Sequence, residues 1–275
     1  MTSPEPSTQT QPAAADELLT HRQGPVRWVV FNRPQARNAM TWNMYERLVE
    51  ICREVNEDPS VRAMILTGST SRGPAFVAGT DIAQFRAFKT PEDALDYEQH
   101  GANVMRTLEE VRVPTIAAIA GPCTGGGAMM AACCDLRLGS PSARFGFPIA
   151  RTLGNCLSVP NYARIVDLIG AARAKDLILR ARLVGAQEML QLGLVTELVS
   201  DEEALLPRAQ EWGEQIAELA PLTLQTTKEA LLRIRDHRVP EGSDADLILR
   251  CYLSSDFREG MEAFLAKRKP NWRGE

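Results

Sequence analysis

The chain has 275 residues, of which 31 are Lys or Arg and 35 are Asp or Glu, so its formal charge is only −4. This near balance excludes the simplest electrostatic case for nucleic acid or an anionic membrane as a partner. With 44% hydrophobic and 24% charged residues, the composition is that of a globular protein and not of a disordered chain.

The cysteines and histidines are few and scattered. Six cysteines, without a Cys-x-x-Cys pair, are too sparse for a disulfide framework, so we expect reduced and mostly buried thiols in a cytoplasmic protein. Three histidines complete no zinc spacing, and no metal site is predicted. No membrane span is predicted either, because prolines and three successive glycines interrupt the uncharged stretch 113–134.

The N-terminal part predicts a tail followed by one strand–helix–strand unit. Residues 1–19 contain no Lys or Arg and no apolar run, which predicts a disordered tail and no targeting segment. The β-branched and aromatic run 26–31 predicts a strand. From Thr41 onwards apolar residues recur at helical spacing, and the apolar run 63–67 predicts a second, buried strand.

The same order recurs further along the chain and predicts an α/β fold. Helices are predicted around 94–111, from about Gly126, near 162–181 and at 186–192, with strands at 115–119, 135–138 and 194–199. From residue 202 the pattern is helical, with breaks at Pro221 and Pro240. We therefore expect a core over 20–201 and a helical region over 202–275 that packs on the core or on another subunit.

Two glycine-containing turns, 76–82 and 121–127, each follow an apolar strand. Such turns bring the backbone close to a ligand and leave first-turn N–H groups free to bind anions or polarised oxygens. Gly121 and Gly126 have the separation of a phosphate loop, but Gly127 and Ala128 stand where Lys and Ser/Thr are needed. Two converging N–H groups would form an oxyanion hole, while plain strand-to-helix connections are the structural alternative.

Six strings in order carry a family resemblance: FNRPQARNAM (31–40), AFVAGTDI (75–82), IAGPCTGGGAMMAACCDLRL (119–138), ARFGFP (143–148), AQEMLQLGLV (186–195) and DFREGMEAFLAKRKPNW (256–272). In these strings the chain resembles the crotonase superfamily, the enoyl-CoA hydratase/isomerase family, over about residues 20–275. The resemblance implies a spiral of repeated ββα units and a C-terminal region that serves in trimerisation and pocket closure. It also implies a homotrimer or a dimer of trimers and an acyl-CoA thioester ligand of fatty acid metabolism, with coenzyme A as part of the substrate and no separate cofactor.

The resemblance also assigns roles to particular residues. The oxyanion donors would be the backbone N–H groups of Thr80 and Gly126. Arg37 is the expected phosphate partner of coenzyme A, with an exposed arginine on a turn as the alternative. Lys267, Arg268 and Lys269 are placed to approach its 3′-phosphate, or form a solvated helix end. The remaining expected substrate contacts are Gln35, Ala36, Ala39, Ala78, Asp81, Ile82, Thr124 and Gly125, with Asp81 favoured as a helix-start residue.

Both positions at which hydratases of this family keep a glutamate are apolar here. They are occupied by Met129, one turn beyond Gly126, and by Ile149, after Phe147-Pro148. Addition of water to a C=C bond needs a group that deprotonates the water and a source of the proton for the α-carbon. Efficient hydration by the two-glutamate route is therefore not expected, and we predict an atypical reaction.

Any replacement for these two carboxylates must come from residues that line the same pocket. The loop 153–162 offers Cys156, Ser158, Asn161 and Tyr162, and His100 lies on the helix after the first turn. An inert buried thiol is the alternative for Cys156, and a surface position is the alternative for His100. The other function classes are an acyl-CoA-binding pseudoenzyme and an RNA-binding protein, the latter disfavoured by the absence of a Lys-rich helix.

Overall fold

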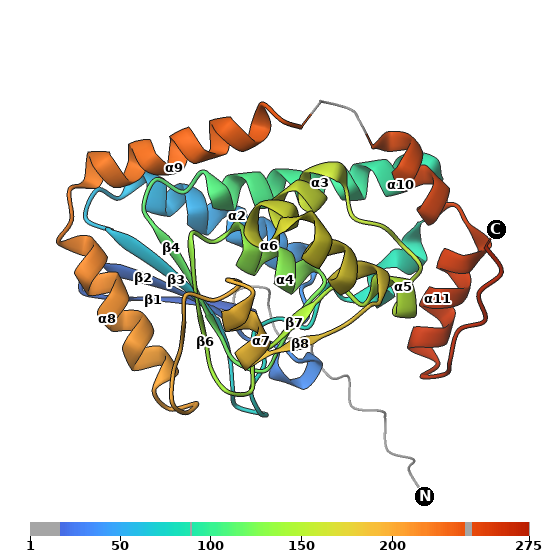
Figure 1. The fold of residues 1–275 in the computed structure, drawn as a ribbon, viewed down its shortest axis with the longest axis horizontal. Helices are drawn as coiled ribbons and strands as arrows, with labels where there is room; N and C mark the ends of the chain where they lie inside the picture. The colour runs from blue at the N-terminus through green and yellow to red at the C-terminus, as the bar shows by residue number, and fades with distance from the viewer. Residues whose placement is uncertain (1–16, 89, 240–243, 275) are drawn as a thin grey trace, which may run out of the picture.

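The computed structural model describes residues 17–88, 90–239 and 244–274, which form a mixed α/β fold (Figure 1). Its larger sheet has the order β1-β2-β3-β4-β6-β9. The first pair is antiparallel and every later pair is parallel. The strands are β1 (Leu18–Gln23), β2 (Val26–Phe31), β3 (Ala63–Gly68), β4 (Thr115–Ile119), β6 (Leu136–Gly139) and β9 (Glu197–Leu198).

Helices cover both faces of this sheet, which explains why every residue of β3 and β4 is buried. One face packs with side chains of α2 (Trp42–Glu57), α3 (Pro91–Glu109), α4 (Gly126–Cys133) and α6 (Val159–Leu179) in the main apolar core. The other face is covered by α8 (Leu205–Ala217), whose Leu205 and Ala209 pack with Val26 and Ile65 of the sheet. Helix α8 is therefore part of the core, although it lies beyond the boundary predicted at residue 201.

A smaller sheet, β5-β7-β8, positions the second glycine turn. Its strands are β5 (Pro122–Thr124), β7 (Arg144–Gly146) and β8 (Val184–Gly185). The pairing of β5 with β7 brings the segment before Ile149 beside the glycines that follow β5, and Gly125 N–H donates to Gly146 C=O at 3.1 Å. The sequence patterns did not predict this sheet, because its strands are only two or three residues long.

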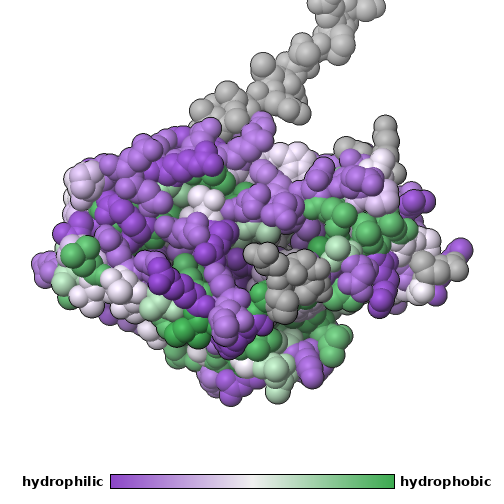
Figure 2. All heavy atoms as spheres, turned by 90° about the horizontal axis from the view of Figure 1, so that it is seen from above, coloured by the Kyte–Doolittle hydropathy of each residue, from purple (hydrophilic) through white to green (hydrophobic). Residues whose placement is uncertain are grey.

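The remaining helices lie around this core. Figure 1 shows α9 along the top of the molecule and α10 and α11 at its right-hand end. Seen from above, the surface is largely hydrophilic with scattered apolar patches (Figure 2). The bounds are η1 (Pro34–Ala36), η2 (Ile82–Ala87), α5 (Ile149–Thr152), α7 (Ala186–Gln191), α9 (Pro221–Asp236), α10 (Ala245–Tyr252) and α11 (Ser255–Leu265).

Two sequence predictions need correction. The predicted tail ended at residue 19, but Leu18 is the first residue of β1 and is buried against the core, whereas residues 1–16 lie outside the described residues. The predicted strand 194–199 contains only Glu197 and Leu198 in the ladder, since pairing with β6 extends over two residues. The predicted break at Pro221 is confirmed, since α8 ends at Ala217 and Pro221 is the first residue of α9; Pro240 lies outside the described residues.

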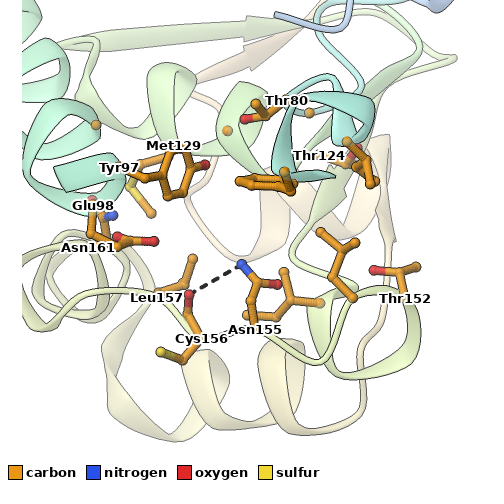
Figure 3. Close-up of a pocket in the computed structure, with 18 of the residues that line it drawn as sticks. Thr80, Tyr97, Glu98, Thr124, Met129, Thr152, Asn155, Cys156, Leu157 and Asn161 are labelled. Atoms are coloured by element: carbon orange, nitrogen blue, oxygen red, sulfur yellow. Dashed lines mark hydrogen bonds between the residues drawn. The ribbon is translucent and has the colours of Figure 1, made fainter. Parts of the chain in front are cut away.

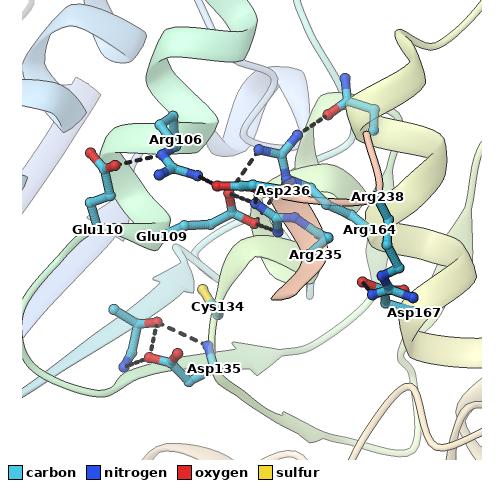
Figure 4. Close-up of polar contacts among 12 residues, drawn as sticks. Arg106, Glu109, Glu110, Cys134, Asp135, Arg164, Asp167, Arg235, Asp236 and Arg238 are labelled. Carbon is cyan, nitrogen blue, oxygen red and sulfur yellow. Dashed lines mark hydrogen bonds and ion pairs between the residues drawn. The ribbon is translucent and has the colours of Figure 1, made fainter. Parts of the chain in front are cut away.

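A buried charge cluster joins α3, α6 and α9 (Figure 4). Glu109 accepts hydrogen bonds from Arg164, at 2.7 and 2.9 Å, and from Arg235. The side chains of Glu109 and Arg164 are each only 4% exposed. Burial alone would raise the pKa of Glu109, but the bonds from both arginines outweigh it and hold that pKa below its ordinary value. This cluster is a structural crosslink between three helices.

Candidate active site

The two glycine turns lie side by side. Val77 and Cys123 form a parallel bridge, and Thr124 N–H donates to Val77 C=O at 3.0 Å. A Cβ atom built on Gly126 would lie 3.8 Å from the backbone nitrogen of Thr80. The pairing of the strand ends therefore brings together the two N–H groups that the sequence analysis selected.

The orientation of both N–H groups follows from the local backbone. Thr80 forms a parallel bridge with Met40, in which the Gly79 carbonyl and the Asp81 N–H make the hydrogen bonds, at 2.9 and 2.8 Å. The Thr80 N–H therefore points away from that bridge. Gly126 is the first residue of α4, where an N–H has no partner within the helix. Among the described residues neither N–H donates a hydrogen bond, so both remain for an oxygen atom in this region.

Hydroxyl groups surround this point. The Tyr45 hydroxyl lies 2.9 Å from Thr80 Oγ1, and a Cβ on Gly126 would lie only 2.5 Å from the Tyr45 oxygen. Burial raises the pKa of Tyr45 to about 12 and also raises that of Tyr97, whose phenol interacts with Thr80. Both phenols therefore stay protonated at neutral pH. A side chain at position 126 would have to displace the Tyr45 hydroxyl.

A cavity of about 190 Å³ opens onto the two turns. Met129 and Ile149, 3% and 8% exposed, contribute to its lining. Helix α4 carries Met129 one turn beyond Gly126, and α5 begins at Ile149 after the smaller sheet. The two positions that correspond, by the resemblance, to the glutamates of hydratases thus line the cavity with apolar side chains. Of the expected substrate contacts, Ala78, Ile82, Thr124 and Gly125 line it as well.

One carboxyl group that the sequence analysis did not select also lines the cavity. Glu98 of α3 lies on the same side of the view as Asn161, with Thr124 and Thr152 opposite (Figure 3). Its Oε1 accepts a 2.6 Å hydrogen bond from the Tyr252 hydroxyl of α10. Burial raises the pKa of Glu98 to about 7, Asp244 adds to the rise, and the Tyr252 hydrogen bond opposes it.

The C-terminal helices form one wall of this region. Tyr252 and Phe257, from α10 and α11, pack with Phe85 of η2 and Leu153 in an aromatic-rich cluster. Phe264 of α11 reaches the cavity lining itself. Residues more than 150 positions apart in the chain therefore meet at Glu98.

The loop candidates divide into those that line the cavity and those that do not. Asn155, Cys156, Asn161 and His100 line it. The hydrogen bond with the Cys251 thiol, followed by burial, raises the pKa of Cys156 well above its ordinary value, which disfavours a nucleophilic thiolate. Ser158 is buried at the N-terminus of α6, and Tyr162 packs against the main core; neither is among the lining residues.

The turn expected to meet coenzyme A lies beside the first glycine turn, because Ala78 N–H donates to Arg37 C=O at 3.0 Å. Gln35 and Arg37 are exposed, while Ala36 and Ala39 are half-buried. The carboxylate of Asp81 caps η2 through Ala83 N–H at 3.2 Å and pairs with Arg33 at 3.1 Å, as expected of a helix-start residue. Arg268 is paired with Glu259, and Lys267 and Lys269 are exposed.

Two further observations concern residues 17–88, 90–239 and 244–274 only. Within them no cluster of three or more His, Cys, Asp or Glu side chains is arranged to hold a metal ion. No helix among them is long and apolar enough to cross a membrane.

Comparisons with known proteins point to one family. The enoyl-CoA hydratase/isomerase family model matches residues 21–275. The crotonyl-CoA hydratase of Syntrophomonas wolfei is 32% identical over 94% of this chain and 98% of its own length. An enoyl-CoA hydratase/carnithine racemase structure from Magnetospirillum magneticum is 32% identical with a TM-score of 0.76, covering 95% of this chain and 97% of its own.

A methylmalonyl-CoA decarboxylase in complex with 2-nitronate-propionyl-CoA has a TM-score of 0.85 at 26% identity, covering 94% of this chain and 99% of its own. The family model and the curated hydratase both extend over nearly the whole chain, from the first sheet to the C-terminal helices. The chain therefore belongs to the enoyl-CoA hydratase/isomerase family and has the crotonase fold.

Proposed function

We propose that this protein binds an acyl-CoA thioester and stabilises its enolate with the backbone N–H groups of Thr80 and Gly126. The observation that carries the proposal is the approach of the two glycine turns, with 3.8 Å between a Cβ on Gly126 and the Thr80 nitrogen. Two preorganised donors aimed at one oxygen favour the charge that develops there when an enolate forms. The exposed turn at Gln35 and Arg37 is the proposed contact for coenzyme A.

The proposed reaction differs from hydration by two glutamates. Relatives of this chain are named as hydratases, yet Met129 and Ile149 can neither deprotonate water nor donate a proton. Loss of a positioned acid or base typically costs about 10²–10⁴-fold in rate. The apolar pair instead favours an apolar acyl group beside the thioester.

Decarboxylation is the second candidate. An apolar wall raises the free energy of a substrate carboxylate and so favours the loss of CO₂. The C–C bond breaks, its electron pair moves into the thioester carbonyl, and the enolate oxygen meets the two N–H donors. The apolar Met129 and Ile149, together with the likeness to a methylmalonyl-CoA decarboxylase, support this candidate.

Product analysis by mass spectrometry tests these reactions. The protein is incubated with crotonyl-, 3-enoyl-, malonyl- and aryl-acyl-CoA, alongside Gly126→Ala and Gly185→Ala. Turnover of at least one substrate is expected, with a loss of about 10²–10³-fold in Gly126→Ala because the added Cβ displaces the hydroxyls around the donors. Gly185→Ala is the matched control, since its Cβ meets only the Arg144 side chain at 3.7 Å.

Two outcomes would count against the proposal. Hydration of crotonyl-CoA at rates typical of two-glutamate relatives would show that our interpretation of Met129 and Ile149 is wrong. Tight binding of acyl-CoA without turnover of any of the four substrates would favour the pseudoenzyme.

A homotrimer, or a dimer of trimers, is the proposed assembly. Helix α9 has no buried residue, and its Leu222, Leu231 and Ile234 are 74%, 63% and 59% exposed. Three large apolar side chains on one exposed helix are typical of a surface covered in an oligomer. Light scattering coupled to size exclusion gives the assembly mass directly, and a monomer at micromolar concentration would contradict the proposal.

A further inference from the structure

The partly buried carboxyl group of Glu98 differs from the fully buried carboxyl of the same helix, Glu109. Among the ion pairs of the described residues, none includes Glu98, whereas Glu109 is held by two arginines. Glu98 lines the cavity in which Thr80 and Gly126 lie, and Glu109 does not. A partly buried carboxyl without a cationic partner, facing a cavity, needs a reason other than structural pairing.

A chain of hydrogen bonds holds Glu98 in place from the far side of the cavity. The Tyr252 hydroxyl donates to Glu98 Oε1 at 2.6 Å, and Asn155 Nδ2 donates to the Tyr252 oxygen at 3.3 Å. Asn155 itself lines the cavity, and its Oδ1 is buried with no hydrogen-bond partner among the described residues. Among the described residues, Glu98 Oε2 accepts no hydrogen bond, and we assign this oxygen to the ligand.

We propose that Glu98 is the proton-transferring residue of this site, in place of the glutamates absent at positions 129 and 149. The inference rests on the proposed function. The carboxylate of Glu98 takes a proton from the carbon next to the thioester carbonyl. The electron pair of that C–H bond moves into the carbonyl, forming the enolate whose oxygen accepts the Thr80 and Gly126 N–H groups. The carboxylic acid so formed returns the proton to carbon.

The environment suits both halves of this transfer. A carboxyl with a pKa of about 7 is present in its basic and its acidic form near neutral pH. The titratable groups that interact with it come from every neighbouring element. They are Tyr45 of α2, Tyr97 of α3, Cys156 of the loop after α5, Tyr162 of α6, and Asp244 and Tyr252 at the two ends of α10. His100 of α3 lines the same cavity.

Hydrogen–deuterium exchange into butyryl-CoA tests the proposal, because a saturated acyl chain exchanges its α-protons through the enolate and undergoes no hydration. In D₂O, the protein is expected to catalyse the incorporation of deuterium at the α-carbon of butyryl-CoA, which mass spectrometry detects as an increase in the mass of butyryl-CoA. Glu98→Gln is expected to slow the exchange by about 10²–10⁴-fold. Asp96→Asn removes an exposed carboxyl from the same helix and is expected to leave the rate unchanged.

The variants separate the failure of this inference from the failure of the proposed function. If Gly126→Ala abolishes exchange while Glu98→Gln retains the full rate, the enolate site stands and the assignment of Glu98 is overturned. If the unmodified protein binds butyryl-CoA but exchanges no deuterium, enolate formation fails and both proposals are overturned.

Tyr252 is assigned as a positioning residue, and the pH profile of exchange tests that role. Its hydrogen bond favours the ionised carboxylate, so Tyr252→Phe is expected to move the rising limb of the profile to higher pH. A purely structural role would lower the rate without moving that limb. An unmoved limb in Tyr252→Phe would therefore remove Tyr252 from the proposal.

Discussion

Helix α3 carries two glutamates in opposite environments. At its C-terminal end Glu109 is buried between Arg164 and Arg235, and the two arginines hold its pKa below the ordinary value. Three turns earlier Glu98 faces a cavity with a phenol as its donor, and burial raises its pKa to about 7. The contrast teaches that burial alone does not decide the role of a carboxyl; its partners do.

The two residues also affect stability with opposite signs. A carboxyl whose folded pKa is lowered stabilises the protein above its unfolded pKa, and the contribution is lost as pH falls through the folded value. A carboxyl whose folded pKa is raised has its contribution in full below the unfolded pKa of about 4.5, and loses it as pH rises through about 7. Glu109 therefore favours the fold at neutral and alkaline pH, and Glu98 opposes it there.

The largest expected effect is that of Glu109→Gln. The substitution leaves the Arg164 guanidinium, 4% exposed, without a compensating charge. Removal of one partner from a buried ion pair costs about 3–5 kcal/mol, so the urea midpoint at pH 7 should fall markedly. Glu110→Gln, an exposed change one residue away, is the control. Equal urea midpoints for the two variants would contradict the structural role assigned to Glu109.

Glu98→Gln is expected to act in the other direction. The rise of the Glu98 pKa to about 7 corresponds to a loss of at most about 3 kcal/mol in folding stability at a pH where Glu98 is ionised, and the variant avoids this loss. Urea unfolding should show the variant more stable than the unmodified protein at pH 9 and similar to it at pH 5. A variant that is less stable at pH 9 would mean that the charge of Glu98 is well compensated.

Arg235→Gln tests the contribution of one of the two arginines that bind Glu109. Glu109 keeps Arg164 but loses the 2.9 Å bond from Arg235 Nη2 together with its second contact. Hydrogen bonds to a charged group contribute about 1.5–3 kcal/mol, and a loss within that range is expected. The acid limb of the stability curve should also move to higher pH, because one of the groups that lowers the Glu109 pKa is gone.

The smallest effect is expected from Asp96→Asn. Asp96 is exposed on α3, two residues from Glu98, and a surface substitution of this kind usually changes stability by less than about 0.5 kcal/mol. Thermal unfolding of this variant should match that of the unmodified protein. A larger change would show that charge anywhere on α3, and not only at its buried positions, governs stability.

Much of the fold follows from local patterns. The strand predicted at 26–31 and that at 115–119 have the same bounds as β2 and β4, because β-branched residues and flanking turns define both. The helix predicted from Thr41 begins there, with the Thr41 side chain accepting Met44 N–H. Strand β1 was missed because its outer residues are polar and exposed; its pairing with β2 holds it in the sheet.

The candidate site was only half predictable. Both oxyanion donors follow from glycine turns and a resemblance, and the structure brings these turns together. A signal for Glu98 was present, since it lies four residues after the buried Ala94 and seven before the buried Met105, on the apolar face of α3. Its partner Tyr252 lies 154 residues away, and no local pattern connects the two positions.

The hydrogen bond between Tyr252 and Glu98 also makes helix α10 part of an equilibrium. Because the phenol favours the ionised carboxylate, ionisation of Glu98 strengthens this one bond between α10 and α3, and loss of the bond alone raises the affinity of Glu98 for its proton by the same free energy. Proton occupancy of a carboxyl in the cavity and the strength of a contact made by a C-terminal helix are thereby linked reciprocally.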